Sequence, residues 1–164
     1  MTVSLADFAY IVGRWEGSGR AEYPTIAPLD YREELIFAAN SKDSVIHFEQ
    51  RTWIKSLDTK NDEPLFWESG FLIDKGSGLF ELVSAQKSGR VEILRGKAER
   101  TNEGTLKLHL VSVAILNDDR MIRSGRLLHF QKETLEYELE MSTTKNVTYQ
   151  KHLSARLTLK NGVH

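Results

Sequence analysis

Apolar and polar residues alternate along most of this chain, in short segments separated by Gly, Asn, Asp or Ser. A period of two is typical of β-strands that have one face buried. The turn residues between the segments, as at 75–78 (Lys-Gly-Ser-Gly), indicate tight connections and therefore antiparallel strands. The alternation predicts ten strands, over residues 14–22, 30–39, 44–55, 65–73, 79–86, 90–100, 105–116, 121–131, 134–143 and 150–160.

An antiparallel sheet of this size must protect its two edges, and closure into a barrel does so directly. We therefore expect an all-β fold, a ten-stranded up-and-down β-barrel of the lipocalin or fatty-acid-binding-protein kind, with a β-sandwich as the alternative. Residues 5–12 carry apolar side chains at helical spacing and predict a short helical turn that closes one end. Pro24 and Pro28 predict a crossover loop after the first strand. With no repeat or linker, residues 1–164 are expected to form a single domain.

Composition narrows the possible functions. The chain has 164 residues, of which 40% are hydrophobic, so it has room for a core or an internal pocket. A formal net charge of -1 argues against nucleic acid and anionic membrane as partners. The absence of cysteine excludes disulfides and thiolate sites. The first residues show neither a signal peptide nor a membrane anchor, so a cytoplasmic location is expected.

One glycine-rich block near the N-terminus stands out, with Gly13, Trp15, Gly17 and Gly19 at alternate positions. Glycine lets a strand bend or approach another backbone closely, because it has no Cβ. An interleaved tryptophan supplies a large apolar anchor. We predict that this block closes and bends a barrel, and that it does not itself contact a ligand.

Motifs for known chemistry are mostly absent: the chain has no P-loop, no dinucleotide-binding glycine pattern and no nucleophile elbow. His47, His109 and His129 lie within predicted strands, and we expect them to be surface or hydrogen-bonded histidines. The adjacent pair Glu33 and Glu34 must point to opposite faces of a strand. We expect both carboxylates to be solvated.

Several motifs taken together resemble the nitrobindins, which are small haem-binding β-barrels related in architecture to fatty-acid-binding proteins. The resemblance runs in order along the chain, from about residue 5 to about residue 160. It is carried by Gly13-x-Trp15-x-Gly17-x-Gly19, Glu-Tyr-Pro-Thr-Ile at 22–26, Glu-Ser-Gly at 68–70, Met-Ser-Thr-Thr at 141–144 and His152-Leu153.

The resemblance implies a haem b held in a cleft at one barrel end by a single histidine. On the matching positions, His152 would be the axial iron ligand and Thr25 would contact the haem. Family members bind nitric oxide and isomerise peroxynitrite to nitrate at a ferric centre. This chain is therefore expected to be a ferric haem protein, a monomer or homodimer, with turnover left open. The alternative is a carrier of a fatty acid or another small hydrophobic ligand, without haem.

The chain departs from the family pattern ahead of Glu-Ser-Gly. Haem-binding relatives carry a Met-His pair near the distal face there, whereas this chain reads Leu65-Phe66-Trp67. A distal histidine is therefore absent at the expected place. The bulky residues either make the distal side drier or fill space that haem would occupy.

The last predicted strand raises a second question. A regular strand with its apolar face inward would turn His152 and Arg156 outward. A bulge near Ser154, or a partly polar interior, would bring His152 into the pocket. In that case Arg156 is a candidate partner for a ligand carboxylate. Arg120 and Arg123 are candidates to pair with haem propionates at the cleft mouth.

Overall fold

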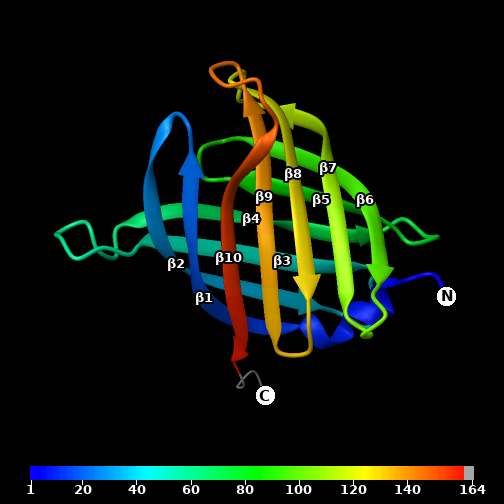
Figure 1. The fold of residues 1–164 in the computed structure, drawn as a ribbon. Coiled ribbons are helices and arrows are strands. Elements are labelled where there is room, and N and C mark those ends of the chain that lie inside the picture. The colour runs from blue at the N-terminus through cyan, green and yellow to red at the C-terminus, as the bar shows by residue number, and fades with distance from the viewer. Residues whose placement is uncertain (161–164) are drawn as a thin grey trace.

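The computed structural model describes residues 1–160, in which ten antiparallel strands close into a barrel (Figure 1). Each strand pairs with its neighbours in the chain, and β1 closes the ring by pairing with β10. The prediction of a barrel is confirmed, because the sheet is closed, whereas a β-sandwich would have left unpaired edge strands. The strands are β1 (Gly13–Tyr23), β2 (Ile26–Ala39), β3 (Val45–Ile54), β4 (Pro64–Asp74), β5 (Leu79–Gln86), β6 (Val91–Arg100), β7 (Leu106–Leu116), β8 (Met121–Phe130), β9 (Thr134–Thr143) and β10 (Gln150–Lys160).

The start of β2 is the one boundary that differs from its predicted position by more than one residue. This strand begins at Ile26, so a tight turn connects β1 to β2 and the predicted crossover loop is wrong. Pro28 lies inside β2, where only β1 is a neighbour, because pairing with β3 begins at Tyr31. A proline is tolerated at such an unpaired edge, since its missing N–H removes no ladder hydrogen bond.

A short 3-10 helix, η1 (Leu5–Ile11), closes the end of the barrel at which β1 begins. Phe8 from this helix is fully buried and packs edge-on against Phe130, with 5.6 Å between ring centroids. Trp15 is also fully buried and donates a hydrogen bond from Nε1 to the Ile11 carbonyl oxygen at 2.8 Å. The predicted helical turn is therefore present, and we call this end the closed end. Within residues 1–160, no helix has the length and apolar character of a membrane span.

Two glycines of the N-terminal block allow β1 to approach its neighbours closely. A Cβ on Gly17 would collide with the backbone of β10 at Arg156. A Cβ on Gly19 would collide with the Tyr31 ring and with the carbonyl oxygen of Ser154. The block therefore lies where β1 completes the ring, in the geometry that closure requires.

Candidate ligand pocket at the open end of the barrel

A pocket of about 350 Å³ occupies the opposite end of the barrel, which we call the open end. This end carries the β1–β2, β3–β4, β5–β6, β7–β8 and β9–β10 connections, because the strands alternate in direction. The volume lies within the range of small-molecule sites, roughly 300 to 1,000 Å³. Its upper wall is apolar and is formed by Ala21, Ile26, Leu29, Leu65, Phe66, Met121, Leu139, Met141 and Leu153.

His152 reaches this pocket through a β-bulge in β10. The pairing of β10 with β9 shifts between Lys151 and Leu153, so His152 has no partner residue across the ladder. A bulge breaks the two-residue alternation of side chains. His152 and its neighbour Leu153 therefore both line the pocket. A regular strand would have turned the His152 side chain outward. The bulge that turns it inward lies at His152 itself and not near Ser154, where it was predicted.

The surroundings keep the His152 ring neutral at physiological pH. Burial, reinforced by the positive charge of Arg90, lowers the pKa of His152 to about 4. Nδ1 is buried and has no hydrogen-bond partner among the described residues, and the ring packs edge-on against Tyr23 at 6.2 Å between centroids. A neutral imidazole with a free nitrogen is the form that binds a metal ion.

A second bulge, at Leu65 in β4, shapes the wall across the barrel from His152. It allows Leu65 and Phe66 both to line the pocket, although they are adjacent in sequence. Trp67 points outward, is 47% exposed and lies under the Arg51 guanidinium, 4.1 Å from the ring centroid. Only Phe66 of the two bulky aromatic residues therefore narrows the pocket.

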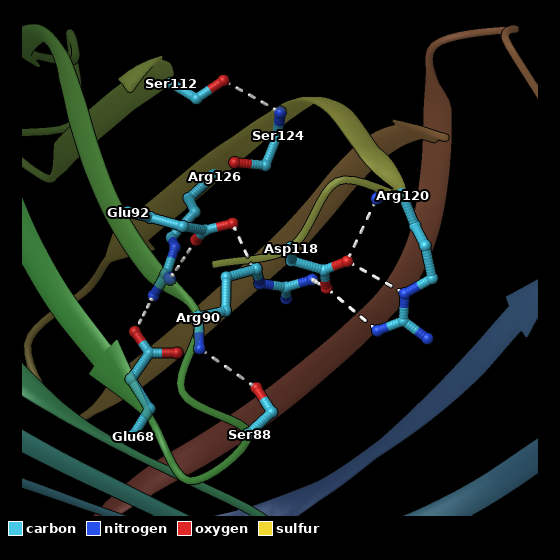
Figure 2. A network of polar contacts seen from close by, with 9 residues as sticks. All are labelled: Glu68, Ser88, Arg90, Glu92, Ser112, Asp118, Arg120, Ser124 and Arg126. Atoms are coloured by element: carbon cyan, nitrogen blue, oxygen red, sulfur yellow. Dashed lines mark hydrogen bonds and ion pairs between the residues drawn. The ribbon is translucent and has the colours of Figure 1, made fainter. Parts of the chain in front are cut away.

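The floor of the pocket is a buried charge cluster of Arg126, Glu68 and Glu92. Figure 2 shows the contacts of this cluster. Arg126, from β8, donates to Glu68 Oε1 at 2.5 Å and to Glu92 Oε2 at 3.1 Å. Burial alone would lower the pKa of Arg126, but the two carboxylates more than offset it and leave the pKa raised. The cluster was missed by sequence reasoning, although these residues occupy inward positions of their strands.

Glu33 belongs to a second buried polar group, so the expectation that it is solvated is wrong. Its side chain accepts hydrogen bonds from Gln50 Nε2 at 2.6 Å and from the Tyr137 hydroxyl. Burial raises the pKa of Glu33 to about 7. Glu34 points to the opposite, outer face and pairs with Arg14, as the strand period requires. Gln50, Tyr137 and Arg126 separate the pocket from a cavity of about 50 Å³ below.

The remaining candidates lie at the rim or outside. Thr25 is exposed in the β1–β2 turn, next to Ile26, which lines the pocket. Arg156 is on the outer face, where its guanidinium pairs with Glu136 at 3.1 Å. Arg156 therefore does not point into the pocket, as a partner for a ligand carboxylate would have to. After the bulge the strand returns to regular alternation, which turns this side chain outward.

Two further arginines at the mouth have partners of their own. Arg120 holds Asp118 with contacts of 2.9 and 3.0 Å (Figure 2). Arg123 stacks over the Tyr149 ring, 4.3 Å from its centroid. Neither of them lines the pocket, whereas Arg90 does.

A closed antiparallel barrel with a plug at one end and a largely apolar pocket at the other defines the class of small-ligand-binding β-barrels. A family model described as the THAP4-like, heme-binding beta-barrel domain matches residues 4–158. The chain belongs to this haem-binding family, and the resemblance to the nitrobindins is confirmed.

Relatives cover nearly the whole barrel. A protein of Arabidopsis thaliana named peroxynitrite isomerase Rv2717c is 34% identical over 153 residues, which are 93% of this chain and 87% of that protein. Peroxynitrite isomerase 1 of Rhodococcus jostii is 36% identical over 140 residues, covering 85% and 73% of the two chains. The crystal structure of Rv2717c from M. tuberculosis superposes with a TM-score of 0.85 at 28% identity, covering 96% of this chain and 97% of that one.

The pocket residues suit the haem group that the family binds. The upper wall offers an apolar surface to a porphyrin, and the bulge supplies one neutral imidazole. Within residues 1–160, the buried Nδ1 of His152 has no hydrogen-bond partner, which is unusual for a buried polar atom. His152 would hold the iron, and Leu65 and Phe66 would face the group from the other wall.

Proposed function

We propose that the protein binds ferric haem b in the open-end pocket, with His152 as the axial ligand, and isomerises peroxynitrite to nitrate. The observation that carries the proposal is the bulge that directs a neutral histidine into the pocket of a haem-binding family barrel. The curated relatives named peroxynitrite isomerases support the reaction. We further infer a cytoplasmic location and a monomer or homodimer built from this single domain.

The chain's own residues would bind, orient and shield the group. His152 is neutral without having to lose a proton at pH 7, because its pKa is already near 4. Phe66 and Leu65 exclude water from the opposite side, and Thr25 lies at the rim. When bound, ferric haem supplies a Lewis-acid iron for the rearrangement. Peroxynitrite and nitrate are isomers, so no co-reactant is needed.

A haemin titration followed at the Soret band tests the proposal, with His152→Ala and His129→Ala compared with the wild type. His129 is a matched control, because it lies outside the pocket and its Nε2 contacts Thr105 Oγ1 at 2.8 Å. We expect stoichiometric binding to the wild type and the control, and no saturable binding to His152→Ala. Haemin retention by His152→Ala would overturn the axial assignment.

The reaction is then measured by stopped-flow decay of peroxynitrite with the haem-loaded protein, together with the yield of nitrate. Faster decay and a higher nitrate yield than with apoprotein are expected. Equal decay and yield would restrict the function to haem binding.

A carrier of a fatty acid or another small hydrophobic molecule is the second candidate function. The apolar upper wall beside a partly free arginine favours it, because a fatty acid presents the same two chemistries. A lipid that co-purifies with a colourless protein would support this function over the first.

A further inference from the structure

The two arginines that line the pocket differ in how far their donors are used. Arg126 has both Nη groups bound to carboxylates, at 2.5 and 3.1 Å. Arg90 lies at the end of the β5–β6 turn, and its buried Nε has no hydrogen-bond partner in the part of the chain that the structure describes. Nε lies 3.5 Å from a carboxylate oxygen of Glu92, and Nη1 donates a long hydrogen bond of 3.4 Å to Asp118. Arg90 is therefore the pocket arginine that retains donor capacity.

Arg90 shares both of its carboxylate partners with another arginine (Figure 2). Asp118 accepts hydrogen bonds from Nε and Nη2 of Arg120, and Glu92 accepts one from Arg126. These closer contacts leave Arg90 with the longest contacts in the network. A guanidinium presents five N–H donors in a rigid fork that matches a carboxylate.

Arg90 is also placed where the charged end of an amphipathic ligand would lie. Its side chain is 21% exposed as a whole, although its Nε is buried, so solvent reaches part of the side chain. It lines the same pocket as the apolar upper wall and His152. A ligand whose apolar body lies against that wall could direct a carboxylate toward this fork, because both line one pocket.

We propose that Arg90 is the carboxylate-binding group of the pocket, which takes a haem propionate or the head group of a fatty acid. The inference rests on the proposed function only in requiring a ligand in this pocket, and not on the chemistry of iron. Arg90 thus takes the role that the sequence had suggested for Arg156, Arg120 and Arg123. A charge-assisted, two-pronged contact of this kind is among the stronger hydrogen bonds in proteins.

The test compares each carboxylate with its uncharged analogue. Haemin and haemin dimethyl ester are titrated into the wild type, Arg90→Gln and Arg123→Gln, the last being a rim arginine outside the pocket. We expect Arg90→Gln to weaken haemin about ten-fold and to leave the ester unchanged, while Arg123→Gln changes neither. Equal effects of Arg90→Gln on acid and ester, or no effect on either, would overturn the inference while leaving haem binding intact.

A variant with the opposite expected sign guards against a simple folding defect. Asp118→Asn removes a carboxylate that competes with the ligand for Arg90. It should therefore increase the affinity for haemin and leave the affinity for the ester unchanged. Weaker haemin binding to Asp118→Asn than to the wild type would contradict the competition argument.

A parallel arm with dodecanoate and dodecanol, measured by calorimetry, separates the two sources of the carboxylate. Arg90-dependent binding of dodecanoate without any haemin binding would reject the haem function and support the role of Arg90. Binding of neither carboxylate by the wild type would overturn both.

Discussion

The two ends of the barrel are built from the same ten strands but differ in regularity. At the closed end the strand alternation is unbroken, and Phe8 and Trp15 are fully buried. At the open end, bulges at Leu65 and His152 break the alternation, and polar as well as apolar side chains line the interior. In this barrel the regular parts of the strands form the apolar core, and the bulged parts form the ligand pocket.

Buried polar atoms mark the same difference. Side chains with a buried N or O atom that lacks a hydrogen-bond partner gather around the pocket: Thr52, Glu68, Arg90, Glu92, Ser124 and His152. Such atoms destabilise a fold, and they are uncommon in cores. Their concentration at one end indicates that the open end is arranged for a ligand at the expense of stability. Four predictions test this contrast.

The largest effect is expected from Trp15→Ala at the closed end. It removes a fully buried indole and its hydrogen bond to Ile11, which should lower the free energy of unfolding by roughly 3 to 5 kcal/mol. Chemical denaturation measures the change. Trp67→Ala is the matched control on the outer face and should cost less than about 1 kcal/mol. Similar losses for the two variants would contradict the assigned closed-end core.

The pH dependence of apoprotein stability separates the middle of the barrel from the open end. Glu33 has its pKa raised from 4.5 to about 7, so its contribution is full below pH 4.5 and is lost as pH rises through 7. His152 has its pKa lowered from 6.5 to about 4, so its contribution is present above pH 6.5 and is lost as pH falls through 4. The two slopes oppose each other between pH 4.5 and 6.5.

Single variants should therefore uncover opposite slopes of stability against pH, each spanning roughly 3 kcal/mol. Stability of Glu33→Gln should rise with pH between 4 and 6.5, since only the His152 slope remains. Stability of His152→Ala should fall between pH 4.5 and 7. Denaturation curves at a series of pH values give both slopes, and parallel profiles for the two variants would reject this account.

Phe66→Ala at the open end is expected to change binding more than folding. Removing a partly exposed ring should lower stability by only about 1 kcal/mol. Haemin affinity should increase a few-fold, because the ring narrows a pocket of about 350 Å³. An unchanged Soret titration would show that Phe66 does not obstruct the haem, and Leu65→Ala is the neighbouring comparison.

The smallest effect is expected from Arg156→Gln, which lies at neither end. Its pair with Glu136 is exposed on the outer face, and such surface pairs contribute less than about 1 kcal/mol. Stability should change by about 0.5 kcal/mol or less, and the affinities for haemin and dodecanoate should not change. A clear loss of carboxylate binding would return Arg156 to the site and displace Arg90.

Much of the fold was predictable from the sequence, because strand period and turn residues are local properties. The ten strands, the helical turn and the barrel follow from them, and the motif order identifies the family. The start of β2 was missed because Pro28 is a poor strand residue except where one side of the strand is unpaired, and pairing is not a local property.

The site was only partly predictable. The sequence by itself, through its resemblance to a family, indicated His152 as the candidate ligand and Phe66 as a residue of the distal wall. Only the tertiary structure decided that His152 faces inward, that Glu33 is buried and that Arg90 lines the pocket while Arg156 does not. The physical reason is that a one-residue bulge reverses the face of a side chain, and its position depends on the register between strands distant in sequence.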